Sequence, residues 1–269
     1  LTNSCFIVVS KSGNTLETIT NLNAVFSKNF LKNKLIIITE IRDSRLMDFA
    51  NKHNAEIIEH KEFIGGRYSV LSESGMFPAA LMGLSINKFR SLQTLIKNKN
   101  FISFLIRNVA SIYTLNSKRI NNSIILNYDS NLNDLGYWYQ QLVAESLGKK
   151  GKGINPILSI GPKDHHSLLQ LYLDGPKDKF FTFFSSSTKS STKIESTINA
   201  QRKATKNIFK KNKIPYRQFF FKKNDEGTLG AIFTFFVLET ILLSYLINVN
   251  PYDQPAVEQV KIETKKFLK

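Results

Sequence analysis

Cysteine is nearly absent from this chain, because Cys5 is the only one among its 269 residues. A single thiol excludes a disulfide framework and a zinc site built from cysteines, and it is typical of a reducing cytosol. Acidic residues are also scarce: 21 Asp and Glu stand against 37 Lys and Arg, which leaves a formal net charge of +16 and favours anionic partners. Hydrophobic residues still make up 42% of the chain, so it can bury a core and is not a disordered tail.

The length and the first residues bear on how the chain is organised. A chain of 269 residues predicts about two domains, at roughly 150 residues each. It opens at Leu1 and runs almost at once into the apolar stretch Cys5–Val9, without a basic flank or a small-residue cleavage site, so we expect no signal peptide. We expect the sequence to be the C-terminal part of a longer protein.

One apolar stretch, Leu229–Val249, approaches the length of a membrane span. It contains Glu239, and a carboxylate in the middle of a bilayer costs about 2.5–3.5 kcal/mol. Pro251 and Pro255 follow immediately. We therefore predict a helix buried in a soluble domain, no membrane association and a cytoplasmic location.

Apolar runs of strand length alternate with amphipathic stretches, which predicts an α/β fold with mainly parallel sheets. The segment Glu73–Leu115 shows no strand and is expected to be helical, and Ser185–Thr192 is expected to be a surface loop. Strands are expected at Cys5–Val9, Leu35–Thr39, Ser123–Tyr128, Ile157–Ile160, Lys179–Phe184 and Tyr216–Phe221. Helices are expected at Thr15–Phe30, Ser44–His53, Asn131–Leu147, Asp164–Leu173, Lys193–Lys211 and Glu226–Asn248.

The first motif with chemical content is Ser10–Thr18, between a strand and a helix. Hydroxyl groups and unpaired backbone N–H groups at a helix N-terminus favour a phosphate dianion. The alternative is an ordinary helix cap, with Asn14 or Ser12 as N-cap and Glu17 as its partner. The motif alone does not decide between the two.

Two further motifs suggest a reacting centre. In Gly65–Ser69, paired glycines let the backbone approach a ligand and Arg67 could hold oxyanion charge, although a turn beside a surface arginine is commoner. Gln141 and Glu145 stand four residues apart and share a helix face. Glu145 could then abstract a proton from carbon, or the pair is simply a solvated polar face.

The pair His165-His166 argues against a metal site, because adjacent helical side chains point about 100° apart. One histidine could still shuttle protons. Lys261, after the stretch Asn250–Gln254, would by itself be a solvated lysine.

Taken together, these motifs resemble glucose-6-phosphate isomerase. Those that carry the resemblance stand in that family's order: Ser10–Thr18, Gly65–Ser72, Gln140–Lys149 and Asn250–Gln254, with Lys163–Tyr172 similar to the bacterial form. The resemblance covers practically the whole chain. The family's first glycine-rich phosphate loop has no counterpart in it, and Asn14 and Val260 depart from the family pattern.

The resemblance implies a role for each matching residue. Ser10, Ser12 and Thr15 match phosphate-binding hydroxyls, with the Lys11 backbone beside them. Arg67 matches the arginine that stabilises the enediolate, and Glu145 matches the base that moves a proton between C2 and C1, with Gln141 as a substrate contact. His166 and Lys261 match the ring-opening pair, and the family's histidine comes from the partner subunit, which implies a homodimer.

The implied fold is the sugar-isomerase (SIS) type, with flavodoxin-like parallel sheets flanked by helices in two SIS subdomains, the first incomplete. Residues 1–60 would be the remainder of the small domain, 61–120 a helical connection, 121–250 the large domain and 251–269 a terminal helix with Lys261. The implied reaction interconverts glucose 6-phosphate and fructose 6-phosphate through a cis-enediol, without metal or cofactor.

Two alternative functions remain open. The chain could be an isomerase of another hexose phosphate such as mannose 6-phosphate, or a non-catalytic phosphosugar-binding SIS module. The latter usually accompanies a DNA-binding helix-turn-helix, which we do not find. Specific nucleic-acid binding is not expected, because the lysines are scattered and no RNA- or DNA-binding pattern is present.

Overall fold

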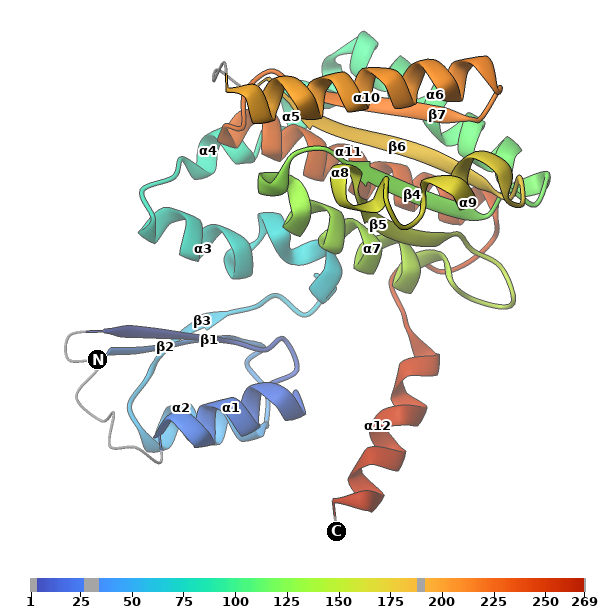
Figure 1. Cartoon of the computed structure of the whole chain (residues 1–269). Helices are drawn as coiled ribbons and strands as arrows, with labels where there is room; N and C mark the ends of the chain where they lie inside the picture. Colours follow the sequence, from blue (N-terminus) through green and yellow to red (C-terminus); the bar gives the residue numbers. More distant parts are fainter. Residues whose placement is uncertain (1–3, 27–33, 188–191, 269) are drawn as a thin grey trace. The chain divides into compact units, whose positions relative to one another are not determined.

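The computed structural model describes residues 4–26, 34–187 and 192–268. The chain divides into two compact units, Leu1–Arg90 and Ser91–Lys269, each with its own parallel β-sheet (Figure 1). The division falls inside the segment 61–120 that we expected to connect two domains. The four domain limits drawn from the sequence stay a prediction.

The first unit contains a three-stranded sheet in the order β1-β2-β3, with strands Cys5–Val9, Lys34–Thr39 and Glu56–Glu59. Because β2 is central, every one of its residues from Leu35 onward is buried. Helices α1 (Leu16–Phe26) and α2 (Arg45–Lys52) lie on the same side of this sheet (Figure 1). Their apolar residues pack with those of β2: Ile19, Leu22, Leu46 and Ala50 against Leu35 and Ile37.

Short helices follow the first sheet. They are the 3₁₀ helix η1 (Gly66–Leu71), α3 (Glu73–Leu81) and α4 (Ile86–Phe89). The second unit begins with α5 (Leu92–Lys97) and α6 (Lys99–Ser117). The prediction that this part of the chain is helical is confirmed.

The second unit is built on four parallel strands in the order β5-β4-β6-β7. Helices α8, α9 and α10 pack on one face of the sheet, and α6, α7 and α11 on the other. The strands are β4 (Asn122–Asn127), β5 (Asn155–Ile160), β6 (Lys179–Ser186) and β7 (Tyr216–Phe221). The remaining elements are η2 (Ser130–Leu132), α7 (Asn133–Leu147), α8 (Gly161–Asp164), α9 (Leu169–Asp174), α10 (Lys193–Lys211), α11 (Glu226–Leu246) and α12 (Pro255–Phe267).

Strand β6 contributes buried side chains to both faces of the second sheet. Phe181 and Phe183 point to the α10 side, where both rings contact Phe209. Phe184 points to the other side and contacts Phe236 of α11. Such alternation is the period-two rule of strands, and a strand buried on both faces reads as a continuous apolar run.

Helix α11 is long and apolar enough to cross a membrane. Half of its most apolar window is buried inside the structure. The carboxylate of Glu239 accepts a hydrogen bond from each of the two terminal nitrogens of Arg217, one of them at 3.0 Å. Burial lowers the pKa of Arg217, but the charge and hydrogen bonds of Glu239 outweigh this and leave the pKa raised. The helix thus packs in the second unit through its own buried ion pair.

Three expectations from the sequence were wrong in detail. The helix expected over Asp164–Leu173 is two short helices separated by a turn that contains His165 and His166. Strand β3 was not predicted. The loop expected over Ser185–Thr192 begins later, since Ser185 and Ser186 belong to β6, and residues 188–191 lie outside the described part. Residues 27–30 of the helix expected over Thr15–Phe30 also lie outside it.

Candidate active site

The candidate phosphate loop, residues 10–15, joins the carboxyl end of β1 to the start of α1. Ser10 continues the sheet, because its N–H donates to the carbonyl of Ile38 at 3.0 Å. The hydroxyls of Ser10 and Thr15 lie 2.8 Å apart, Ser10 being buried and Thr15 exposed. The fold therefore brings two of the predicted phosphate-binding hydroxyls together at a helix start.

Gly13 makes the tight turn of this loop. Its φ is +65°, and a Cβ built there would lie 2.2 Å from Oγ of Ser44. Only glycine fits both the left-handed backbone and the close approach of α2. The Gly13 carbonyl accepts from the N–H of Leu46 at 3.0 Å, so the loop is tied to the first turn of α2.

Neither Asn14 nor Ser12 caps the helix that follows, so the alternative cap assignment was wrong. The helix begins at Leu16, and the residue before it is Thr15. Oγ of Ser12 accepts from the N–H of Asn14 at 3.3 Å, and Oδ1 of Asn14 accepts from the N–H of Arg45 at 3.1 Å. Asn14 thus serves the N-terminus of α2 and not that of α1.

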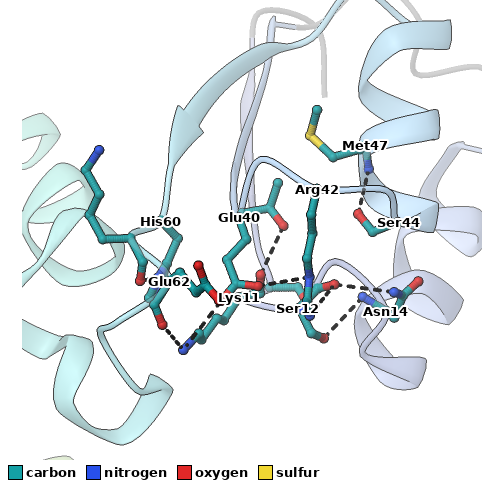
Figure 2. Close-up of polar contacts among 12 residues, drawn as sticks. Lys11, Ser12, Asn14, Glu40, Arg42, Ser44, Met47, His60 and Glu62 are labelled. Atoms are coloured by element: carbon teal, nitrogen blue, oxygen red, sulfur yellow. Dashed lines mark hydrogen bonds and ion pairs between the residues drawn. The ribbon is translucent and has the colours of Figure 1, made fainter.

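A buried carboxylate organises the charges around the loop (Figure 2). The side chain of Glu40, directly after β2, is 7% exposed. It lies 3.4 Å from Nζ of Lys11 and 2.9 Å from Nε of Arg42. Arg42 also donates to the carbonyl of Ser12 at 3.3 Å, and Lys11 donates to that of Glu62 at 2.7 Å. Two cations share one carboxylate, which leaves a net positive charge beside the hydroxyls.

Sequence reasoning missed Glu40 and Arg42. The signal that could have found them is their position, since they directly follow the buried strand Leu35–Thr39. Residues after the carboxyl ends of parallel strands face the place where such sheets bind ligands.

Arg67 is buried, only 3% exposed, which rules out the alternative of a surface arginine beside a turn. It lies in η1 with its guanidinium carbon 5.4 Å from the ring centre of Tyr68. Hydroxyl-to-carbonyl hydrogen bonds hold this segment: Ser69 to Gly66 at 2.7 Å and Ser72 to Ser69 at 2.8 Å. A charged side chain held in so rigid a segment is suited to a fixed electrostatic role.

In the second unit, α7 presents Gln141 and Glu145 on one face. Nε2 of Gln141 donates to Oε1 of Glu145 at 3.1 Å, and Glu145 is half-buried while Gln141 is exposed. The spacing expected from the sequence is therefore realised as a direct contact. A carboxylate oriented by an amide is suited to proton abstraction, because the hydrogen bond fixes its geometry.

Lys149 ties the end of α7 to the stretch before α12. Its Nζ donates to the carbonyl of Ser146 at 3.2 Å and lies 3.0 Å from Oδ1 of Asp253, and it also donates to the carbonyl of Asn250. The hydrogen bond from Lys149 lowers the pKa of Asp253. The helix that carries Glu145 is thereby linked to the segment that leads to Lys261.

His166 and Lys261 are both exposed. His166 lies in the turn between α8 and α9, while Lys261 lies on α12 and pairs with Glu258 at 2.5 Å. The structure thus places the sequence-predicted residues in two sets. Ser10, Lys11, Ser12, Thr15 and Arg67 belong to the first unit, and Gln141, Glu145, His166 and Lys261 to the second. Among the described ranges, no group of three or more His, Cys, Asp or Glu side chains is placed to hold a metal ion.

Solved structures define the class to which this fold belongs. A hypothetical protein from Thermus thermophilus superposes with a TM-score of 0.84 at 24% identity, over 97% of this chain and 71% of that one. A glucose-6-phosphate isomerase from Chlamydia trachomatis gives 0.73 at 17% identity, over 97% of this chain and 58% of that one. The fold is the sugar-isomerase type of α/β fold, as expected.

The family follows from sequence comparison. The family model described as phosphoglucose isomerase matches residues 1–159. The glucose-6-phosphate isomerase of Methanocaldococcus jannaschii is 34% identical over 97% of this chain and 71% of its own length. The chain belongs to the phosphoglucose isomerase family.

Proposed function

We propose that this chain is an aldose–ketose isomerase that interconverts glucose 6-phosphate and fructose 6-phosphate through a cis-enediol. The observation that carries the proposal is membership of the family together with a half-buried carboxylate, Glu145, oriented by Gln141 at 3.1 Å. A 1,2-proton shift needs one base that can act at both carbons, and a positioned carboxylate is such a base.

Binding begins at the phosphate loop. The hydroxyls of Ser10, Ser12 and Thr15 hold the phosphate beside Lys11 and Arg42, and this remote binding positions the sugar for reaction. His166 and Lys261 open the ring: one accepts the proton of the anomeric hydroxyl and the other supplies a proton to the ring oxygen. The open-chain aldose then has an acidic C2 proton next to its carbonyl.

Isomerisation uses a single carboxylate. Glu145 takes the C2 proton, the electron pair moves toward the carbonyl oxygen at C1, and Arg67 stabilises the negative charge that develops there. Glu145 then returns the proton to C1 while the hydroxyl proton at C2 passes to the oxygen at C1, which leaves a carbonyl at C2 and a hydroxyl at C1 and completes fructose 6-phosphate. No atom is gained or lost and no external oxidant enters.

The proposal includes a cytoplasmic homodimer in which each subunit receives His166 from its partner. This arrangement predicts that His166→Ala and Glu145→Gln subunits, each inactive alone, regain activity when mixed. Random pairing makes about half of the dimers mixed, and each mixed dimer has one intact site of two. The mixture should therefore recover roughly a quarter of normal activity. Sedimentation velocity gives the assembly state directly, and a monomer with full activity would contradict the shared site.

The deciding experiment follows deuterium loss to water from C2-deuterated glucose 6-phosphate. We expect exchange with the chain, and a loss of about 10²–10⁴-fold in Glu145→Gln. The matched control is Asp134→Asn, which removes a carboxylate from the first turn of the same helix and should keep full activity. More than about 3% residual turnover in Glu145→Gln would contradict the base assignment, because a lost general base costs far more than that.

Two results would point to the alternative functions. Phosphosugar binding without exchange in the unmodified chain would favour a non-catalytic module. Faster turnover of mannose 6-phosphate than of glucose 6-phosphate would favour the sibling isomerase.

A further inference from the structure

A partly buried hydrogen-bond network surrounds His165, the histidine that the mechanism does not use. Nε2 of His165 lies 2.7 Å from the hydroxyl of Tyr128 and 3.2 Å from Oγ1 of Thr205. Tyr128 follows β4 and Thr205 lies on α10, and both are at most 8% exposed. One imidazole is therefore fastened to a strand end and to a helix that are distant in sequence.

The hydrogen bonds of this network run in one direction. Thr205 donates its hydroxyl proton to the carbonyl of Gln201 at 2.8 Å, so its oxygen is left to accept. Tyr128 can then donate to Thr205 at 3.2 Å. In that arrangement His165 donates from Nε2 to the Tyr128 oxygen, and each donor in the chain has an acceptor.

Burial favours the neutral forms of His165 and Tyr128 in this network. Burial lowers the pKa of His165, the charge of His166 lowers it further, and Asp164 opposes both. Burial raises the pKa of Tyr128 to about 12, against the hydrogen bond of Thr205 and the charge of Arg202 on α10. Both shifts favour the neutral form of each group, the form in which these hydrogen bonds are made.

A second anchor, Asp164, holds the start of the same turn. Oδ2 of Asp164 accepts from the hydroxyl of Ser159 at 2.8 Å and from the N–H of Ile160 at 2.7 Å, both at the end of β5. Its Oδ1 accepts from the hydroxyl of Ser167 at 3.2 Å. His166 lies between His165 and Ser167 in this turn and is itself exposed.

We propose that His165 is a positioning residue, which through Tyr128 and Thr205 holds the turn that presents His166 for ring opening. The proposal rests on the proposed function for the role of His166. It assigns His165 no contact with substrate. The two adjacent histidines then have different roles: His165 holds the turn in place, and the exposed His166 takes part in ring opening.

The first test measures ring opening apart from isomerisation. Exchange between the α and β anomers of glucose 6-phosphate, followed by NMR, reports ring opening, and C2 deuterium loss reports the proton transfer. We expect His165→Ala to slow anomer exchange about tenfold with KM within about twofold, since small misplacement of a reacting group is costly. His165→Gln, which keeps a donor near Tyr128, should recover part of the rate.

A double-mutant cycle separates positioning from a general loss of structure. We expect His165→Ala to add less than about a twofold loss in a His166→Ala background, because both changes remove one function. Equal multiplicative losses in both backgrounds would overturn the proposal.

The final arm needs no activity. The imidazole signals of His166 in a ¹H–¹³C spectrum should shift in Tyr128→Phe, which removes the hydroxyl that His165 contacts. The control is Tyr216→Phe, which removes the hydroxyl of a tyrosine on β7 whose ring packs against Phe183 and Phe209 of the same core. Unchanged His166 signals in Tyr128→Phe would overturn the proposal. An inactive chain in which the signals still shift would instead count against the proposed function alone.

Discussion

Both units hold a glutamate against an arginine beside the sheet, but the two pairs differ in exposure. In the first unit, Glu40 is buried whereas the side chain of Arg42 is 53% exposed. In the second, Glu239 and Arg217 have side chains only 1% and 13% exposed. An arginine that reaches solvent can exchange its partner for an anionic ligand, whereas an enclosed one cannot. The comparison separates a pair suited to binding from a pair that belongs to the core.

The largest effect is expected from breaking the enclosed pair. Glu239→Ala leaves the Arg217 charge buried, and we expect a loss of about 3–5 kcal/mol in the free energy of unfolding. Urea unfolding followed by circular dichroism measures it. The double variant Glu239→Leu with Arg217→Met removes both charges and should be clearly more stable than Glu239→Ala. A loss below about 1 kcal/mol in Glu239→Ala would show that water reaches the pair.

The Glu239–Arg217 pair also shows which features of α11 could be predicted from the sequence. The carboxylate within an apolar stretch predicted a helix packed in a domain, and half of the most apolar window of α11 is buried, but the partner of the carboxylate could not be named. Arg217 lies 22 residues away on β7, and it also donates to Thr182 on β6 at 3.0 Å. Pairings of this kind depend on strand order, which local patterns do not reveal.

The fold class and most elements were predictable because their apolar runs are long. Strands Cys5–Val9 and Tyr216–Phe221 were predicted to the residue. Strand β3 was missed because its two isoleucines stand between glutamates, Glu56 and Glu59, and form too short a pattern.

The site residues named from the sequence stay a prediction, and their geometry could be predicted only in part. The helix expected over Asp164–Leu173 is interrupted where the N–H of His166 donates to the carbonyl of Lys163, three residues back, at 3.1 Å. A bond of this span is typical of a turn and not of the four-residue ladder of an α-helix. The contact between His165 and Thr205, 40 residues apart, is a tertiary contact that no spacing rule predicts.

A smaller effect is expected when Glu40 is neutralised. Glu40→Gln frees Lys11 and Arg42 from their shared carboxylate, so the affinity for inorganic phosphate should rise about fivefold at low salt, and less at high salt. Isothermal titration calorimetry measures the affinity.

The matched control for this change is Glu56→Gln. Glu56 pairs with Lys34 at 3.1 Å in the same unit, at the opposite ends of their strands from the loop. It should leave phosphate affinity unchanged. If Glu40→Gln weakens phosphate binding instead, the carboxylate is needed to hold the two cations in place and does not compete with the ligand.

The smallest effect is expected when Arg42 and Arg217 are each replaced by lysine. Lysine keeps the charge but loses the fork that lets one guanidinium make several hydrogen bonds. Arg42→Lys gives up the simultaneous contacts with Glu40 and Ser12, and because the side chain is largely exposed the unfolding free energy should change by less than about 0.5 kcal/mol. Phosphate affinity should fall only about twofold, since the positive charge remains. Arg217→Lys should cost more than Arg42→Lys, because it also leaves Thr182 and Asn108 without a buried partner. Equal losses of stability at the two positions would remove the distinction between a binding pair and a core pair.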